Sequence, residues 1–394
     1  MKQSAVIFLA FALAACAGTS SSVRAPETAP SDTAPDAAPA PPPEPTVPEL
    51  IAQAAQIHQP QAARELLLRA LAQEPDNPEA HLQLARMDTD SGNGEAAFVH
   101  LAAVLSAQPT HREALQLAAE LTASLPNRLP QTIDLVRRAL ETSPDDAQWL
   151  VLLADLHRKS GNSAEARVVL NQLLAVHPDD GQACVLLAFI SLAEGRFREA
   201  EFHARRALTR LPENAAAHHA LGLAMAARSS GSDDSEAIRS LSQSVQLNAQ
   251  NPAAWVDLGR VLLRNRDCSG AEKAFRHAQA LMPDTPAILL GLAAAVEGQK
   301  DSAGKPRFDE AEKLYRQVMA AMPENPEAAA ALADLKAGPM KDFREAEALY
   351  VRAIELLPEG TRRTQAEKSL ETVRQRLAAE AELSAASVPD AAAP

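Results

Sequence analysis

Residues 252–283 read PAAWVDLGRVLLRNRDCSGAEKAFRHAQALMP, and this stretch decides the fold. It carries two series of apolar and small residues at helical spacing: Trp255, Leu258, Gly259 and Leu262, then Ala271, Phe275 and Ala278. Pro283 ends the second series, because a proline cannot continue a helix. The stretch therefore predicts two helices that are joined by a turn.

The same pattern recurs about every 34 residues along most of the chain. Its most regular marker is a proline after each second helix, replaced once by alanine: Pro75, Pro109, Pro144, Pro178, Pro212, Ala249, Pro283, Pro323 and Pro358. Successive markers are 34, 35, 34, 34, 37, 34, 40 and 35 residues apart. A period of this regularity predicts a solenoid of helix pairs, in which each pair contacts only its neighbours.

Small residues recur at one position of each helix in the pair. The first-helix position holds Ala85, Ala154, Ala188, Gly222, Gly259, Ala293 and Ala333, and the second-helix position holds Ala97, Ala166, Ala200, Ala237, Ala271, Ala311 and Ala346. Only a hydrogen or a methyl group fits where two helices cross this closely, and a larger side chain would force them apart. With the closing proline, this pattern resembles the tetratricopeptide repeat (TPR) family. The resemblance implies an all-α fold, a right-handed superhelical solenoid of antiparallel helix pairs, and a role in binding other proteins.

The pattern divides the chain into five segments. Residues 47–360 hold about nine repeat units, of which the first is degenerate, and residues 361–380 are expected to form a capping helix. Residues 16–46 are rich in proline and alanine and are expected to form a disordered tether, and residues 381–394 a disordered tail. Residues 1–15 are expected to be a signal peptide. Two units carry insertions between their helices, at residues 229–235 and 298–308.

The first 16 residues have the features of a secretory signal. Lys2 precedes an apolar run from Ala5 to Ala15, which is shorter than the roughly 20 residues that a membrane-spanning helix needs. The run ends in Leu13-Ala14-Ala15-Cys16, which resembles the bacterial lipobox. That resemblance implies that acyl chains such as palmitate anchor Cys16 in the outer membrane, with the chain facing the periplasm. The alternative is an ordinary signal peptide with an incidental cysteine near the cleavage site.

Composition narrows the classes of function. The net charge of the 394 residues is -13, which argues against nucleic acid as a partner, because phosphate binding needs a basic face. Cys184 and Cys268 fall two units apart, so we predict no disulfide between them, and no cysteine or histidine spacing is typical of zinc. The sequence also lacks phosphate-loop, nucleophile-elbow and zinc-protease motifs. We therefore predict no enzyme activity, no catalytic residue, no cofactor, no metal and no small-molecule substrate.

The TPR resemblance also predicts a binding groove. In that family the first helix of each pair lines a concave face, which implies a mostly apolar floor formed by Val185, Phe189, Leu192, His219, Leu223 and Val256. Basic residues flank the floor, with Arg158 and Lys159 on one side and Arg260 and Arg264 on the other. This arrangement predicts a site for an extended or helical partner segment with an apolar anchor and an acidic flank. The alternative is that the floor is buried by packing against neighbouring repeats or the cap.

These features together predict a non-catalytic lipoprotein scaffold that binds envelope proteins. The chain resembles pilotin-like and assembly-factor TPR lipoproteins, which implies a role in assembling a secretin, a pilus or an export complex. The alternative is an adaptor for cell-wall hydrolases or for polysaccharide export machinery.

Overall fold

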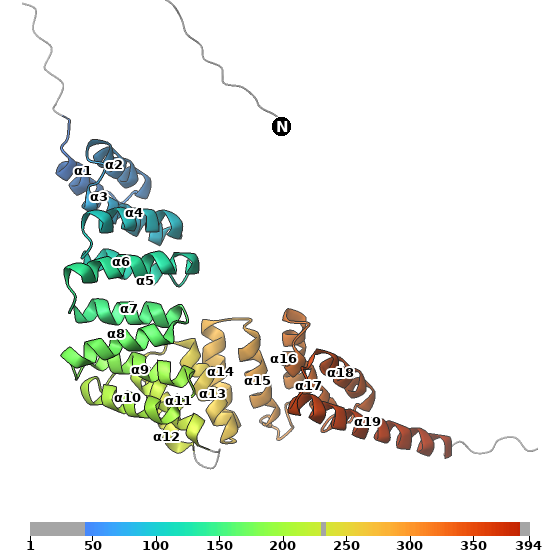
Figure 1. The fold of residues 1–394 in the computed structure, drawn as a ribbon. Helices are drawn as coiled ribbons and strands as arrows, with labels where there is room; N and C mark the ends of the chain where they lie inside the picture. The colour runs from blue at the N-terminus through green and yellow to red at the C-terminus, as the bar shows by residue number, and fades with distance from the viewer. Residues whose placement is uncertain (1–43, 230–233, 387–394) are drawn as a thin grey trace, which may run out of the picture. The chain divides into compact units, whose positions relative to one another are not determined.

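The computed structural model describes residues 44–229 and 234–386, with side chains as far as residue 382 (Figure 1). The expected signal peptide, Cys16, most of the expected tether, residues 230–233 and residues 387–394 lie outside the described residues. The chain divides into two units, Met1–Thr46 and Val47–Pro394. Every described helix belongs to the second of these units.

The described residues form an all-α fold of nine consecutive helix pairs and one final helix (Figure 1). The first pairs are α1 (Val47–Gln56) with α2 (Pro60–Gln73), α3 (Pro78–Asp90) with α4 (Gly94–Ala107), α5 (Arg112–Leu121) with α6 (Leu129–Thr142), and α7 (Ala147–Lys159) with α8 (Ser163–Val176). They are followed by α9 (Gly181–Ala193) with α10 (Phe197–Arg210), α11 (Ala215–Arg228) with α12 (Ser235–Leu247), α13 (Pro252–Arg264) with α14 (Cys268–Leu281), α15 (Pro286–Glu297) with α16 (Phe308–Ala321), and α17 (Pro326–Ala337) with α18 (Phe343–Leu356). A 3-10 turn, η1 (Pro126–Arg128), precedes α6, and α19 (Thr361–Ala386) follows the last pair. The predicted all-α fold class is thereby confirmed.

The links between pairs specify where each first helix begins. In the link before α3, Asn77 accepts a hydrogen bond from the backbone amide of Ala80 at 3.0 Å, and Pro78 occupies the first turn. This is favourable because the first amides of a helix have no partner within it, and proline lacks one of those amides. The same side-chain cap occurs at His111, Asp146, Asp180, Asn214, Asn251 and Asn325. A side-chain cap therefore marks the start of the first helix in these seven pairs, whereas Thr285 before α15 forms none.

Small residues hold the two helices of each pair close together. The residues predicted at the two crossing positions are buried in every unit for which we named them. A Cβ atom added to Gly222 of α11 would lie 2.6 Å from Leu241 Cγ of α12. An added Cβ at Gly259 of α13 would lie 2.8 Å from the Phe275 ring of α14. The predicted reason for the small residues is thus confirmed by the packing.

The final helix is longer than expected. Helix α19 begins at Thr361, as predicted, but it continues to Ala386. Residues 381–386, which we expected to belong to a disordered tail, are therefore helical. The extension follows from its composition, because the stretch AAEAELSAA at 378–386 consists mainly of strong helix formers and contains no Pro or Gly. Leu370 and Val373 are buried against the preceding pair, so this helix covers the end of the core.

The insertion between α15 and α16 is an ordered loop. Arg307 at its end places two guanidinium nitrogens 2.8 and 3.0 Å from the carboxylate of Glu272 on α14. This pairing lowers the pKa of Glu272 to about 2. Gln299 at the start of the loop donates to the backbone carbonyls of Cys268 and Ala295 at 3.1 and 3.0 Å. Hydrogen bonds to α14, in the preceding helix pair, therefore hold both ends of the insertion in place.

Candidate functional site

A cavity of about 550 Å³ lies across four consecutive first helices, α5, α7, α9 and α11. We call it the central cavity. Equivalent positions of successive units line it: Gln148, Val151 and Arg158 on α7, Gln182, Val185 and Phe189 on α9, and Ala216 on α11. Val185 is buried, whereas Phe189 and Val151 are half-buried and keep part of their surface open to the cavity. First helices therefore present one shared, mainly apolar floor.

The structure brings together some of the predicted groove residues in this cavity and places others beside it. Val185, Phe189 and Arg158 line the central cavity. His219 is buried next to it, with its ring edge-on to that of Phe189 at a centroid distance of 6.0 Å. Its Nε2 lies 2.9 Å from a carboxylate oxygen of Asp257 on α13. This contact links α9, α11 and α13 on the side of the first helices.

The remaining predicted groove residues do not line the central cavity. Leu192 and Leu223 are half-buried, and Val256 is half-buried against the core of the last four pairs and α19. Arg260 is exposed and lines a different cavity. The Arg264 guanidinium donates to both carboxylate oxygens of Asp234 and to the carbonyl of Ala226, at 2.7 Å each. The ten predicted residues therefore do not form one continuous groove.

The basic residues beside the central cavity have acidic partners of their own. Arg158 Nη2 lies 2.6 Å and Lys159 Nζ 3.0 Å from the carboxylate of Asp155, on the same helix. The spacing of three and four residues makes such pairs predictable on any helix. Sequence reasoning treated Arg158 and Lys159 as free cations and did not consider this shared carboxylate. The cations are thus less available to an acidic partner than we expected.

Sequence reasoning missed the contribution of α5 to the central cavity. Arg112 and Gln116 of α5 line it, and so does Trp149 of α7. The Arg112 guanidinium lies 5.4 Å from the Trp149 ring centroid, pairs with Asp146 at 3.0 Å and donates to Gln148. Helix α5 ends early, at Leu121, and its sequence matches the repeat pattern only weakly. Its cavity-lining positions could therefore not be assigned from the repeat pattern.

A second cavity, of about 630 Å³, lies across α13, α15, α17 and α19, and we call it the C-terminal cavity. Both tyrosines of the chain donate from second helices to carboxylates on this side. The Tyr350 hydroxyl lies 2.5 Å from Asp334, which lines the cavity, and the Tyr315 hydroxyl lies 2.9 Å from Glu297. Burial raises the pKa of Glu297. This cavity therefore combines an alanine-rich floor with hydrogen-bonded acids, and it differs chemically from the central cavity.

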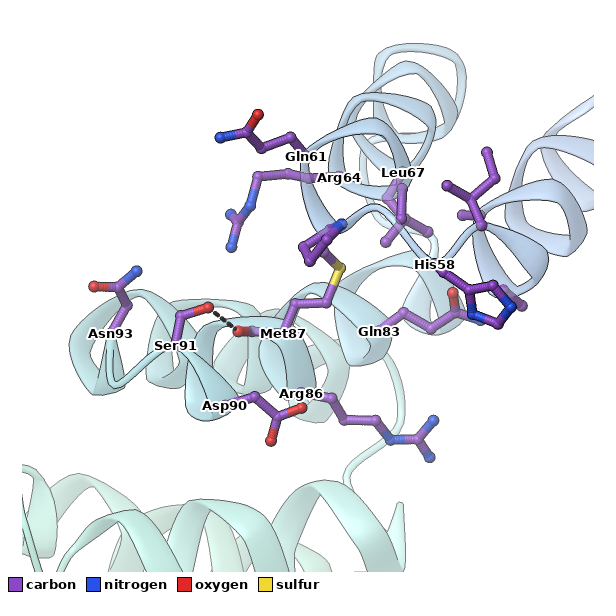
Figure 2. A pocket seen from close by; sticks show the side chains of 15 residues that line it. His58, Gln61, Arg64, Leu67, Gln83, Arg86, Met87, Asp90, Ser91 and Asn93 are labelled. Carbon is purple, nitrogen blue, oxygen red and sulfur yellow. Dashed lines mark hydrogen bonds between the residues drawn. The ribbon is translucent and has the colours of Figure 1, made fainter.

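A third cavity, of about 860 Å³, lies at the first two pairs, between the α1–α2 turn, α2 and α3. Figure 2 shows Met87 of α3 extending toward α2, with Leu67 above it and His58 beside Gln83. Arg64 on its wall forms an ion pair with the buried Asp88. The degenerate first unit, which lacks most of the repeat pattern, gave no signal for this cavity.

Within 44–229 and 234–386, no three histidine, cysteine or acidic side chains are grouped so that they could hold a metal ion. In the same ranges, no helix has the length and apolar character required to cross a bilayer.

Burial lowers the pKa of His100, His157 and His203, so these rings favour their neutral form.

Stacked helix pairs whose first helices line shared cavities define a class of proteins, the helical-repeat scaffolds that bind other proteins. Residues 54–121 and 127–188 match a tetratricopeptide repeat family model. Residues 224–364 match the TPR domain of cytochrome c-type biogenesis protein H. The chain is a tetratricopeptide repeat protein and a scaffold for protein–protein interaction, and neither match is to a family of enzymes.

The solved structure of the APC/C hetero-tetramer Cut9–Hcn1 has the same fold. A chain of it matches with a TM-score of 0.55 and 15% identity, over 83% of this chain and 67% of that one. A tetratricopeptide repeat protein from Parabacteroides merdae matches with a TM-score of 0.39 and 14% identity, over 75% and 98% of the two chains. The human IFIT1 dimer with PPP-AAAA matches with a TM-score of 0.44 and 18% identity, over 76% and 79%. No curated protein sequence matches this chain.

Proposed function

We propose that this chain is a scaffold of c-type cytochrome biogenesis, which binds segments of its partner proteins along its first helices. The central cavity is the observation that carries the binding mode. Residues from the same positions of α7, α9 and α11 meet there around a half-buried phenylalanine, Phe189. An aromatic anchor in a concave, mainly apolar site is the usual centre of a peptide-binding surface.

The match of residues 224–364 to the TPR domain of cytochrome c-type biogenesis protein H supports the choice of partner. The C-terminal cavity falls largely within that range, since α13, α15 and α17 belong to it. The hypothesis of secretin, pilus or export-complex assembly has no matching family, and neither has the alternative of an adaptor for cell-wall hydrolases or polysaccharide export. The partners that we propose are therefore components of cytochrome c assembly.

We also propose that Cys16 is lipidated and anchors the helix pairs to the outer membrane, facing the periplasm. The support is the sequence pattern from Leu13 to Cys16, which lies outside the described residues. A Cys16→Ala variant is expected to lose acyl labelling and to leave the membrane fraction. An acyl-labelled, membrane-bound variant would contradict the anchor without affecting the proposal on partners.

Photocrosslinking in living cells tests the proposed partners. A photoreactive amino acid at position 182 samples the central cavity, and one at position 331 samples the C-terminal cavity. We expect crosslinks to cytochrome c precursors or their assembly factors, and we expect a deletion strain to lose haem staining of c-type cytochromes. Normal haem staining together with lost secretin multimers or pili would instead support the assembly hypothesis from sequence.

A matched pair of variants separates binding from folding. Phe189→Glu places a charge on the floor of the central cavity, whereas Phe202→Glu places the same charge on α10, at a ring that is 60% exposed. We expect Phe189→Glu to remove the crosslinks from position 182 and Phe202→Glu to preserve them. Equal crosslinking by both variants would contradict binding in the central cavity.

A further inference from the structure

The charged side chains that line the central cavity are compensated by one another. Arg158 pairs with Asp155 at 2.6 Å, and Arg112 pairs with Asp146 at 3.0 Å. A carboxylate of a partner protein that approached either arginine would lie beside the carboxylate already there. A partner ammonium or guanidinium group at Asp155 would likewise meet Arg158. Each charged side chain that lines the cavity therefore already has an oppositely charged partner, and the carboxylate of Asp155 also pairs with Lys159 beside the cavity.

Exchange of these ion pairs would bring little binding energy. Exposed ion pairs contribute about 0–1 kcal/mol, whereas burial of a Val, Leu or Phe side chain contributes about 1.5–3 kcal/mol. The floor offers such burial, because Val151 and Phe189 are half-buried and the Phe189 ring is supported edge-on by His219. An apolar side chain therefore gains more in this cavity than a charged one.

The polar groups at the cavity indicate the backbone conformation of the occupant. Gln182 is exposed, lines the cavity and makes no side-chain hydrogen bond to any described residue, whereas Gln148, at the equivalent position of α7, accepts from Arg112. A primary amide offers both donors and an acceptor. An extended segment presents free backbone amides and carbonyls to such a group, whereas a helix uses them internally.

We infer that the central cavity takes an uncharged, apolar segment of the partner protein in an extended conformation. The segment inserts an aliphatic or aromatic side chain above Val151 and Phe189, and its backbone pairs with the Gln182 amide. This inference rests on the proposed binding function, and it replaces the acidic flank that the sequence predicts with a segment that has no required charge.

A peptide-display selection on the full chain tests the inference. The probes are random 12-mers, and clones that also bind the Phe189→Glu variant are removed. We expect the enriched peptides to carry apolar residues without a recurring charge, and their affinity to change less than about twofold between about 50 and about 500 mM NaCl. Enriched peptides with recurring acidic or basic residues, and affinities that fall with salt, would overturn the inference.

Charged variants at position 182 provide a second readout that does not disturb the floor. Gln182→Glu and Gln182→Lys both replace the amide, so we expect both to weaken the enriched peptides by similar factors, about two- to tenfold. Tighter binding by the Lys variant and weaker binding by the Glu variant would show an acidic ligand, and the reverse pattern a basic one. Either result would overturn the inference.

The same selection separates this inference from the proposed function. Enriched peptides that are charged and depend on Phe189 would support binding in the central cavity. They would contradict only the inference that the bound segment is uncharged. Peptides that bind Phe189→Glu as well as the native chain, or a selection without any enriched peptide, would contradict both. The Phe202→Glu variant, with the same added charge, is expected to bind like the native chain.

Discussion

The carboxylate of Asp234, before the first residue of α12, accepts two hydrogen bonds from the Arg264 guanidinium at the end of α13, both at 2.7 Å. Only 1% of the Asp234 side chain is exposed, and the pairing with Arg264 holds the pKa of Asp234 below its usual range. Arg264 thus joins two consecutive helix pairs. Its position in the sequence is that of a groove residue, but its guanidinium is occupied by the fold.

Arg264→Met should therefore reduce stability. The variant keeps most of the aliphatic stem but leaves a buried carboxylate without its partner, for which we expect a loss of about 1–3 kcal/mol in the free energy of unfolding. Urea denaturation followed by circular dichroism measures the change. Arg260→Met, at a side chain that is 64% exposed, is the control and should change stability by less than about 0.5 kcal/mol. Equal effects of the two variants would show that the Asp234–Arg264 pair has no special role.

Gly222→Ala should destabilise the chain although alanine favours helices. An added methyl group would lie 2.6 Å from Leu241 Cγ and 3.1 Å from the backbone oxygen of Ala237, so the two helices must move apart. Overpacking of this kind costs about 1–3 kcal/mol, which exceeds the gain in helix propensity of about 1 kcal/mol. Gly94→Ala is the control, because the nearest atoms to its added methyl group are side-chain carbons of Leu125 and Leu121 at 3.1–3.7 Å, and not backbone. A lower melting temperature for Gly222→Ala than for Gly94→Ala is the expected outcome.

Acidification should weaken the second helix pair through His100. Its Asp88 partner on α3 is buried, and its ring lies against that of His81, with the two Nδ1 atoms 2.9 Å apart. Burial and then the neighbouring His81 lower the pKa of His100, whereas Asp88 raises it. The unfolded chain therefore binds a proton more readily, so stability decreases as the pH falls below the usual histidine value of about 6.5.

His100→Gln tests this linkage. We expect the variant to take up fewer protons on unfolding than the native chain, by up to about one, when urea midpoints are compared at pH of about 7.5 and 5.5. His58→Gln, at an exposed histidine, is the control and should preserve the native pH dependence. An unchanged slope in His100→Gln would contradict the role of the buried ring.

Tyr315→Phe should cost more stability at neutral pH than in acid. The Tyr315 hydroxyl donates to Glu297, whose pKa is raised by burial and lowered in part by this hydrogen bond. A raised pKa means that the stability contributed by Glu297 is complete at low pH and is lost as the pH rises. Without the hydroxyl, the pKa of Glu297 rises further and that loss becomes larger.

Unfolding in urea at pH of about 4.5 and about 7.5 measures the difference. We expect Tyr315→Phe to lose about 1–2 kcal/mol more at the higher pH. Tyr350→Phe, whose acceptor Asp334 is exposed, serves as the matched control and should show a weaker dependence on pH. A pH-independent loss in Tyr315→Phe would indicate that the Glu297 charge is not involved.

Local signals in the sequence determined the repeat. The closing prolines, the capping residues such as Asn77 and the small crossing residues such as Gly259 act within one helix pair, so each can be recognised within one period. The end of α19 was predicted too early, because the sequence has no such local signal at that point. No proline or glycine stops the helix at Glu380, and the alanine-rich stretch simply continues it to Ala386.

The tertiary structure decided which of the residues on the first helices come together in a site. Repeat positions alone placed Arg264 on the rim of the groove, but a contact between units occupies its guanidinium group. The partner of Arg264 is Asp234, 30 residues away, and Arg112 of α5 enters the central cavity beside Trp149 of α7. Ion pairs, cavities and the burial of Phe189 depend on distances between helices of different units. The sequence of a single repeat does not contain those distances.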